Sequence, residues 1–296
     1  MQQNNPFTGI VSRRRFVKVV ASALSLPLLP LCSPHDPSRR SAEGRFRFIF
    51  CNDVHYRGDQ KDGVMLTKIL SEWKADVSQW DFAVVAGDLT NFGDFTIMKS
   101  VKEHFDKIGK LYYPVIGNHD VTAKGEEGKK NYVALFGEKR LNYLVIHKNV
   151  GLIFLDLANG ASPWVTVEVS VKLWLKKTLA FISRQTPLIV FSHFPLHPET
   201  PYYAVLNSIE LFRLLDKHNV LAYFSGHLHS RWSGLRNQVP FFTNVRLLPN
   251  WSAGDKYPGS GYMVVDVSQS GVSVKCVETN FGSSRNRIDE GQFGRD

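Results

Sequence analysis

The sequence has little cysteine and no long apolar run. Three cysteines in 296 residues are too few for a disulfide framework. Cys51 ends an apolar run, which indicates a buried thiol rather than a reactive one. The apolar stretch over residues 19–31 is 13 residues long and is interrupted by prolines. Because a membrane-spanning helix needs about 20 apolar residues, this stretch does not predict one.

Dense basic runs are missing from most of the chain, although its formal net charge is +9. Residues 1–40 contain six basic side chains and one acidic side chain, so they account for +5 and the other 256 residues carry only +4. This distribution predicts no stable nucleic-acid partner, whereas a mildly positive body favours small anionic substrates. The aromatic residues, 12% of the chain, are expected to pack in the core and on the surface.

Residues 1–32 have the order of an export leader, in which a basic segment precedes a short apolar one. The segment Ser12-Arg13-Arg14-Arg15-Phe16-Val17-Lys18 resembles the twin-arginine signal, and only Val17 departs from its pattern. We therefore expect the twin-arginine translocase to export the protein to the periplasm or another extracytoplasmic location.

Two alternatives remain open after the leader. Lipid attachment at Cys32 would anchor the protein to a membrane, but Leu29-Pro30-Leu31-Cys32 has Leu where a lipobox requires a small residue. Without attachment, the exported protein is free of the membrane. Residues 33–44 are rich in Pro, Ser and Arg and indicate a linker. The domain is expected over residues 45–281, followed by a polar, loosely ordered tail over residues 282–296.

From residue 45 onward, short apolar runs alternate with amphipathic segments, which predicts an α/β fold. Helices are expected over residues 64–73, 96–108, 171–181 and 209–217. Strands are expected over residues 46–51, 82–86, 111–116, 188–191, 220–224, 240–245, 261–267 and 272–277, with a hairpin over residues 141–146 and 152–157.

Five of the expected strands are followed at once by polar clusters. In chain order these are Asn52-Asp53-Val54-His55, Gly87-Asp88, Gly117-Asn118-His119-Asp120, Ser192-His193 and Ser225-Gly226-His227-Leu228-His229. Each cluster alone is a weak signal, since a lone Asp-x-His or Gly-Asp is usually a solvated turn. In open α/β sheets, however, ligands bind beyond the carboxyl ends of strands, so the five clusters are expected to converge.

Asp and Asn oxygens combined with imidazole nitrogens suit Mn, Fe or Zn. An extended backbone would point both members of Asp53-x-His55, and both members of His227-x-His229, into one site. The glycines before Asp88, Asn118 and His227 would permit sharp turns and close backbone approach. The other five histidines are expected to be structural or exposed, with His197 the least certain.

These residues resemble the motifs of the calcineurin-like metallophosphoesterase superfamily, namely Asp-x-His, Gly-Asp, Gly-Asn-His-Asp/Glu, His and Gly-His-x-His. The resemblance covers roughly residues 45–280 and implies a sandwich of two mixed β-sheets flanked by α-helices. The segment Gly87-Asp88-Leu89-Thr90-Asn91-Phe92-Gly93 resembles the cyclic-nucleotide phosphodiesterase-like branch. Purple acid phosphatases usually carry Tyr where Asn91 stands, so a Tyr-ligated ferric site is not expected.

The resemblance implies a hydrolase of phosphate mono- or diesters with two divalent metal ions, and the leader would export it. One ion would be held by Asp53, His55 and His229, the other by Asn118, His193 and His227, and Asp88 would bridge them. A hydroxide bridging the metals would attack phosphorus. His119 would protonate the leaving alkoxide and would be oriented by Asp120. The partner is then a small phosphate ester.

Two other hypotheses stay open. The chain could be a metal-binding but catalytically inactive member of the family, although all seven ligand types are present. It could also be a nuclease, for which a long basic groove would be expected.

Overall fold

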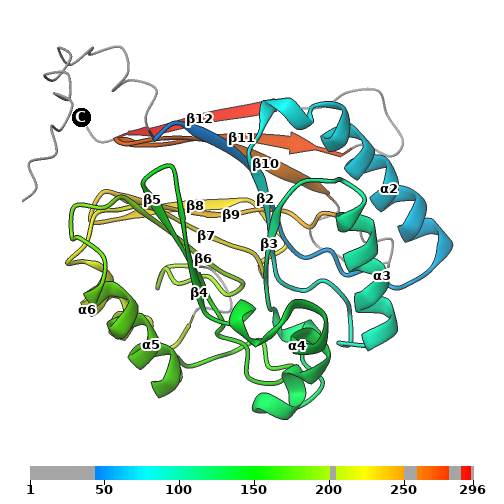
Figure 1. Ribbon diagram of the computed structural model, residues 1–296, viewed down its shortest axis with the longest axis horizontal. Helices are drawn as coiled ribbons and strands as arrows, with labels where there is room; N and C mark the ends of the chain where they lie inside the picture. The colour runs from blue at the N-terminus through cyan, green and yellow to red at the C-terminus, as the bar shows by residue number, and fades with distance from the viewer. Residues whose placement is uncertain (1–43, 201–204, 250–258, 280–287, 295–296) are drawn as a thin grey trace, which may run out of the picture. The chain divides into compact units, whose positions relative to one another are not determined.

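Two six-stranded β-sheets lie face to face in the structure, a computed structural model that describes residues 44–200, 205–249, 259–279 and 288–294 (Figure 1). The chain divides into two units, Met1–Pro37 and Ser38–Asp296. The first unit lies outside the described residues, and with it the predicted leader and Cys32. All elements below belong to the second unit.

The sheets are mixed, as the sequence predicts. In the first sheet the order is β12 (Ile288–Gly294), β11 (Gly271–Glu278), β10 (Gly261–Ser268), β1 (Phe46–Cys51), β2 (Phe82–Ala86) and β3 (Tyr112–Val115). In the second it is β4 (Tyr143–His147), β5 (Val150–Leu155), β6 (Leu188–Ser192), β7 (Val220–Ser225), β9 (Val239–Thr243) and β8 (Trp232–Arg236). The strands β1, β2 and β3 are parallel to one another, and so are β5, β6, β7 and β9.

Alternating side chains of β1 explain why this strand is buried on both faces. Phe46, Phe48 and Phe50 belong to the apolar cluster between the two sheets, whereas Ile49 and Cys51 belong to the cluster that includes the helices. This is the pattern of a parallel strand covered on both sides. Cys51 is fully buried, and burial raises the pKa of its thiol, in agreement with the expected buried cysteine.

Phenylalanines fill the space between the sheets. The rings of Phe154 and Phe191 stack with centroids 4.9 Å apart, and Phe224 continues the row with centroids 5.6 Å from Phe191 and 5.1 Å from Phe242. Such offset pairs add stability beyond their buried area, about 0.5–1.5 kcal/mol each. The expected packing role of the aromatic residues is confirmed for this row.

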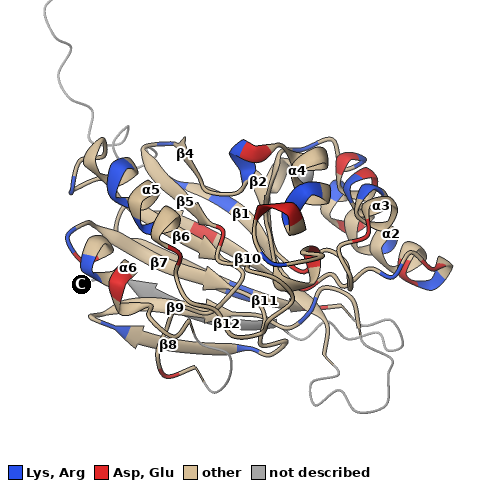
Figure 2. Ribbon diagram, turned by 90° about the horizontal axis from the view of Figure 1, so that it is seen from below, with Lys and Arg blue, Asp and Glu red and all other residues tan. Residues whose placement is uncertain are grey.

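Helices flank both sheets. They are α2 (Gln60–Ala75), α3 (Phe95–Asp106), α4 (Lys130–Phe136), α5 (Val169–Ala180) and α6 (Ile209–Leu215). Figure 1 shows α2 and α3 together on one flank and α5 and α6 on the other. Asp59 and Asp94 cap α2 and α3 by accepting hydrogen bonds from the backbone N–H groups of Asp62 and Ile97. Charged side chains gather on helices and loops, while most strand segments carry none (Figure 2).

The fold class predicted from the sequence is confirmed, and one α-helix and two strands of the described chain were not expected. They are α4, β8 and β12. The last strand lies within the segment that the sequence assigns to a polar tail, and it pairs antiparallel with β11 over seven residues. In the described part of the chain, no helix combines the length and apolarity that a membrane span requires.

Candidate metal centre

All five polar clusters leave the carboxyl ends of strands at one edge of the two sheets. Asp53 and His55 follow β1, Asp88 follows β2 and Asn118 follows β3. His193 follows β6 directly, and the pair His227 and His229 follows β7. Residues from both sheets therefore meet at a single place, as the strand order predicts.

The backbone at these residues differs from the expectation. We predicted an extended backbone at Asp53-x-His55 and at His227-x-His229, and this prediction is wrong. The φ angles are 51° at Asp53, 47° at His55, 52° at Asp88, 70° at His227 and 52° at His229, all in the left-handed region. Each costs on the order of 1–3 kcal/mol and persists only where the surrounding structure enforces it. The side chains converge because the loops turn sharply.

Three glycines bring backbone against ligand side chains, as predicted. An added Cβ would lie 2.5 Å from His193 Nδ1 at Gly87, 2.2 Å from Asp88 Oδ1 at Gly117, and 2.5 Å from Asp53 Oδ2 at Gly226. Real Cβ contacts are essentially never this short, so a side chain at any of these positions would force the neighbouring ligand to shift. Gly87 also has a φ of +81°.

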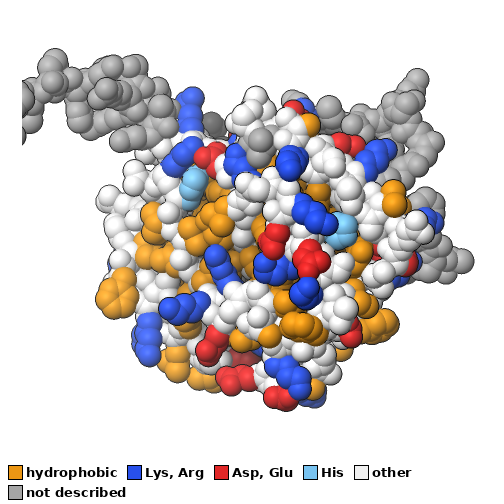
Figure 3. Space-filling view, turned by 45° about the vertical axis from the view of Figure 1, so that its right-hand side comes forward, with side chains coloured by type: hydrophobic (Ala, Val, Ile, Leu, Met, Phe, Trp, Pro, Cys, Tyr) orange, Lys and Arg blue, Asp and Glu red, His pale blue; other side chains and the backbone are white. Residues whose placement is uncertain are grey.

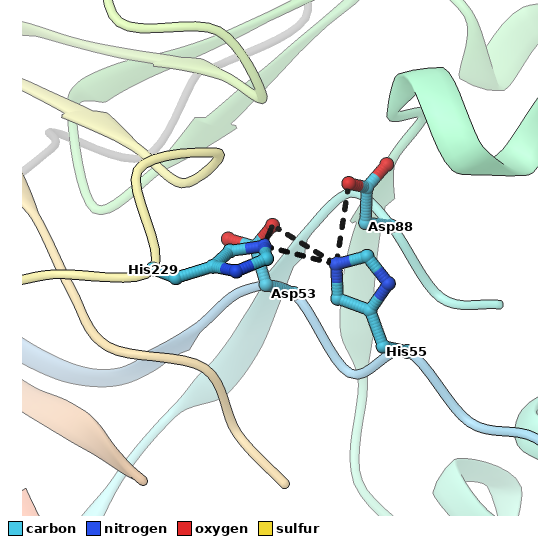
Figure 4. A group of neighbouring side chains, drawn as sticks. All are labelled: Asp53, His55, Asp88 and His229. Atoms are coloured by element: carbon cyan, nitrogen blue, oxygen red, sulfur yellow. Dashed lines mark hydrogen bonds and ion pairs between the residues drawn. The ribbon is translucent and has the colours of Figure 1, made fainter. Parts of the chain in front are cut away.

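Asp53, His55, Asp88 and His229 form the first group that could hold a metal ion (Figure 4). His229 Nε2 lies 3.2 Å from Asp53 Oδ1 and 3.0 Å from His55 Nε2. His55 Nε2 is in turn 3.6 Å from Asp53 Oδ1 and 3.5 Å from Asp88 Oδ2. Carboxylate oxygens and imidazole nitrogens thus point at one small volume.

Asp88, His193 and His227 form a second group. His193 Nε2 lies 3.2 Å from Asp88 Oδ2, 3.2 Å from His227 Nδ1 and 3.2 Å from the amide oxygen of Asn118. The same oxygen of Asp88, Oδ2, therefore faces His55 in the first group and His193 in the second. This is the geometry of a carboxylate shared by two sites.

The outward ring nitrogens are held by oxygen acceptors. His193 Nδ1 donates to the Ala86 carbonyl at 2.9 Å, His227 Nε2 to the Pro163 carbonyl at 3.1 Å, and His55 Nδ1 to the Asn91 side-chain oxygen at 2.8 Å. Because an oxygen acceptor requires a proton on the nitrogen it faces, the opposite nitrogen of each neutral ring presents a lone pair inward.

Two carboxylate oxygens make the donor set fit a cation. Asp53 Oδ1 and Asp88 Oδ2 are buried and accept no hydrogen bond from a backbone or amide group of the described residues. They face the imidazole nitrogens of His229 and His193 instead. Their partner oxygens are bound: Asp53 Oδ2 accepts from the Asn52 amide and the His227 backbone N–H, and Asp88 Oδ1 from the His119 backbone N–H. An unsatisfied buried acceptor costs about 1–3 kcal/mol, which a bound cation would offset.

Burial and neighbouring charges shift the pKa values of the ionisable groups in the centre. Burial opposes the charge on Asp88, but the neighbouring His193 and His55 imidazoles outweigh it and lower the pKa of the carboxyl. Burial likewise opposes a charged His193, yet the Asp88 and Asp53 carboxylates raise its pKa to about 9. Burial and the adjacent His193 lower the pKa of His227 to about 4. In the protein without metal, His193 is therefore protonated on both ring nitrogens and positively charged at neutral pH.

His119 lies beside the first group, and its ring centroid is 4.8 Å from that of His55. Its Nδ1 donates to the Asn91 backbone carbonyl at 2.8 Å. The predicted orienting role of Asp120 is wrong, because the Asp120 carboxylate accepts instead from the backbone N–H groups of Thr90 and Gly117. Burial, with the charge of Asp88, raises the Asp120 pKa to about 8. Asp120 therefore links the loops that follow β2 and β3, and the Asn91 carbonyl orients His119.

His197 stays outside the centre, as expected of a structural histidine. Its Nε2 donates to the Leu235 carbonyl at 3.3 Å, and its Nδ1 accepts from the Glu199 backbone N–H at 3.1 Å. The contacts of Asn91 and Pro163 were not predicted from the sequence. The position of Asn91 within Gly87–Gly93 was a signal for its side-chain contact with His55, but nothing in the sequence marks the backbone carbonyls of Asn91 and Pro163.

Comparison with known proteins assigns the chain to a family. The family model for calcineurin-like phosphoesterases matches residues 46–231, which include all seven candidate ligands. The chain belongs to the calcineurin-like phosphoesterase family. The predicted superfamily is thereby confirmed.

Individual relatives of this calcineurin-like phosphoesterase are distant. A protein named "Probable cyclic nucleotide phosphodiesterase" from Xenorhabdus bovienii is 20% identical over 214 residues, which cover 68% of this chain and 84% of that protein. The match to the purple acid phosphatase PPD1 of yellow lupin has a TM-score of 0.60 at 14% identity and covers 83% of this chain. It spans only 53% of the lupin protein.

A second similar structure is GAP50, the anchor in the inner membrane complex of Plasmodium. It has a TM-score of 0.58 at 16% identity, with 85% of this chain and 90% of that chain covered. At such identities, the two solved structures demonstrate the shared fold alone.

Proposed function

We propose that this calcineurin-like phosphoesterase is an exported enzyme that hydrolyses phosphate mono- or diesters with two divalent metal ions. The observation that carries the proposal is the position of Asp88 Oδ2, which lies 3.5 Å from His55 Nε2 in one ligand group and 3.2 Å from His193 Nε2 in the other. A buried oxygen between two sets of imidazoles suits a bridging ligand.

Each ligand group would hold one ion. Asp53, His55 and His229 would hold one ion, and the other would be held by Asn118, His193 and His227. Bound ions of Mn, Fe or Zn would polarise the phosphate and activate water as the nucleophile. The buried ligands keep both sites in fixed positions through the hydrogen bonds on their outer atoms.

His119 is the candidate proton donor to the leaving oxygen. It is half-buried next to His55, and its Nδ1 is occupied by the Asn91 carbonyl. An imidazolium held in this way has one remaining N–H, on Nε2, which could protonate a departing alkoxide.

The substrate is proposed to be a small phosphate ester rather than a nucleic acid. The name of the Xenorhabdus relative favours a diester, although mono- and diester hydrolysis share one type of metal core. On the face shown in Figure 3, positive and negative side chains are interspersed, so this face lacks the continuous positive surface that a polyanion would favour.

Export is proposed from the leader over residues 1–32. Its twin-arginine motif would direct the folded enzyme to the periplasm or another extracytoplasmic location, where it would release phosphate from external esters. Lipid attachment at Cys32 is the alternative that would retain it at a membrane.

The test is metal content and turnover of purified protein with Asp88→Asn beside the wild type. We expect about two ions per wild-type chain and hydrolysis of mono- or diesters. Asp88→Asn should lower activity to background and weaken metal binding by more than about 100-fold, because a neutral amide replaces the shared carboxylate. Two bound ions without turnover on any ester would favour an inactive family member, and cleavage of DNA alone would favour a nuclease.

A further inference from the structure

Asn91 lies between a candidate metal ligand and the candidate proton donor. Its side-chain oxygen accepts from His55 Nδ1 at 2.8 Å, and its backbone carbonyl accepts from His119 Nδ1 at 2.8 Å. The two rings are nearly perpendicular, at 71°, with centroids 4.8 Å apart. One residue therefore fixes the tautomers of two neighbouring imidazoles that have different tasks.

The loop that carries Asn91 is itself held in place. Tyr56 and Thr90 form an isolated β-bridge, and the Thr90 hydroxyl accepts from the Gly93 backbone N–H at 2.9 Å. The Asn131 amide donates to the Gly93 carbonyl at 2.8 Å from the neighbouring helix α4. Because these bonds do not use the Asn91 side chain, the loop backbone should keep its path when that side chain is changed.

We infer that Asn91 is a positioning residue whose side chain serves metal binding and whose backbone serves proton transfer. The side-chain oxygen directs His55 Nε2 toward the first ligand group, and the backbone carbonyl directs His119 Nε2 away from the loop. This inference rests on the proposed function, because it assigns His55 to a metal and His119 to the leaving group.

The two contacts can be separated by mutation, since one belongs to the side chain and the other to the main chain. Asn91→Ala removes the acceptor for His55 and leaves the acceptor for His119. Asn91→Asp keeps an oxygen at the same distance along the side chain and should restore the contact. Asn131→Ala is the matched control, because it removes a bond that holds the same loop but does not touch His55.

The experiment is titration of the four metal-free proteins with Zn²⁺ by calorimetry, together with the absorption spectra of their Co²⁺ forms. We expect Asn91→Ala to weaken one of two Zn²⁺ sites by about 10–100-fold, as is typical of lost outer-shell contacts, and to change the Co²⁺ spectrum. Asn91→Asp and Asn131→Ala should bind both ions with affinities close to wild type.

A kinetic readout completes the test. At saturating metal, Asn91→Ala should keep the wild-type dependence of rate on leaving-group pKa, because the bond to His119 comes from the backbone. Wild-type Zn²⁺ affinity in Asn91→Ala, no recovery in Asn91→Asp, or an equal loss in Asn131→Ala would overturn the inference. A wild-type protein that binds no Zn²⁺ or Co²⁺ would instead refute the proposed function on which it rests.

Discussion

His55, His193 and His227 each use one ring nitrogen on an oxygen acceptor and direct the other into the candidate metal centre. This arrangement defines the tautomer before any ion arrives, so binding requires little reorientation. It also makes metal binding compete with protons, most strongly at His193, whose pKa is raised to about 9 by the Asp88 and Asp53 carboxylates against the opposing effect of burial.

Metal affinity should therefore depend on pH. Below about pH 9 the His193 ring is protonated in the metal-free protein, and an ion must displace that proton to bind. We expect about one proton to be released from this ring at pH 7.5, and affinity to rise with pH until it levels off near pH 9. Calorimetry in buffers with different ionisation enthalpies measures the release. A binding enthalpy that does not vary with the buffer would contradict this expectation.

The role of His119 can be tested separately from metal binding. His119→Ala should lower turnover by about 10²–10⁴-fold on esters with poor leaving groups and much less on activated aryl esters. Metal content should stay at the wild-type level, because the His119 side chain is in neither ligand group. Rates on a leaving-group series measure the effect, and an equal loss on all esters would argue against proton donation.

Residue types and their order allowed the candidate ligands to be identified from the sequence, because Asp, Asn and His recur where strands end. The left-handed backbone could not be predicted, since Asp53 and His227 reach it only through the packing of loops from two sheets. The partner of His119 was missed for a similar reason, because a backbone carbonyl leaves no mark in the sequence.

At the scale of elements, the turn after β2 is tightly constrained. Gly87 has a φ of +81°, and a Cβ there would meet the ring of His193. The ligands of β2 and β6 can approach one another only because this position lacks a side chain.

Gly87→Ala should therefore destabilise the fold and the centre together. We expect the free energy of unfolding in urea to fall by about 2–4 kcal/mol, from the left-handed backbone and the displaced ring. Gly109→Ala is the control, because Gly109 has a φ of +72° but no atom within 4 Å of an added Cβ. In Gly109→Ala the free energy of unfolding should fall only by the backbone contribution, about 1–2 kcal/mol. Equal losses of unfolding free energy in the two variants would mean that the clash with the His193 ring does not destabilise the fold.

Buried strands were the elements that could be predicted best, because runs such as Phe82–Ala86 are apolar throughout. The segments β8 and β12 are edge strands, and their sequences WSGLR and IDEGQFG include glycine and charged residues. Edge strands need fewer apolar residues, so periodicity alone does not reveal them. The seven-residue helix α4 is too short for a clear helical pattern.

For the whole molecule, the export prediction is independent of the catalytic one. Replacement of both Arg13 and Arg14 by Lys should stop export, because the translocase recognises the arginine pair, while the enzyme should accumulate in the cytoplasm in folded form. Fractionation of cells that express each form measures this effect. Normal secretion of the variant would exclude the twin-arginine route.

The polarity of β1 has a practical consequence. The chain enters the fold at Gly44 and reaches Asp53 only after crossing the sheet along Phe46–Cys51, a path of roughly 20 Å at about 3.3 Å per residue. A label on the exposed Arg45 side chain would therefore lie at the end of β1 opposite the ligands. Such a label could report on the folded state of that strand without touching the candidate metal centre.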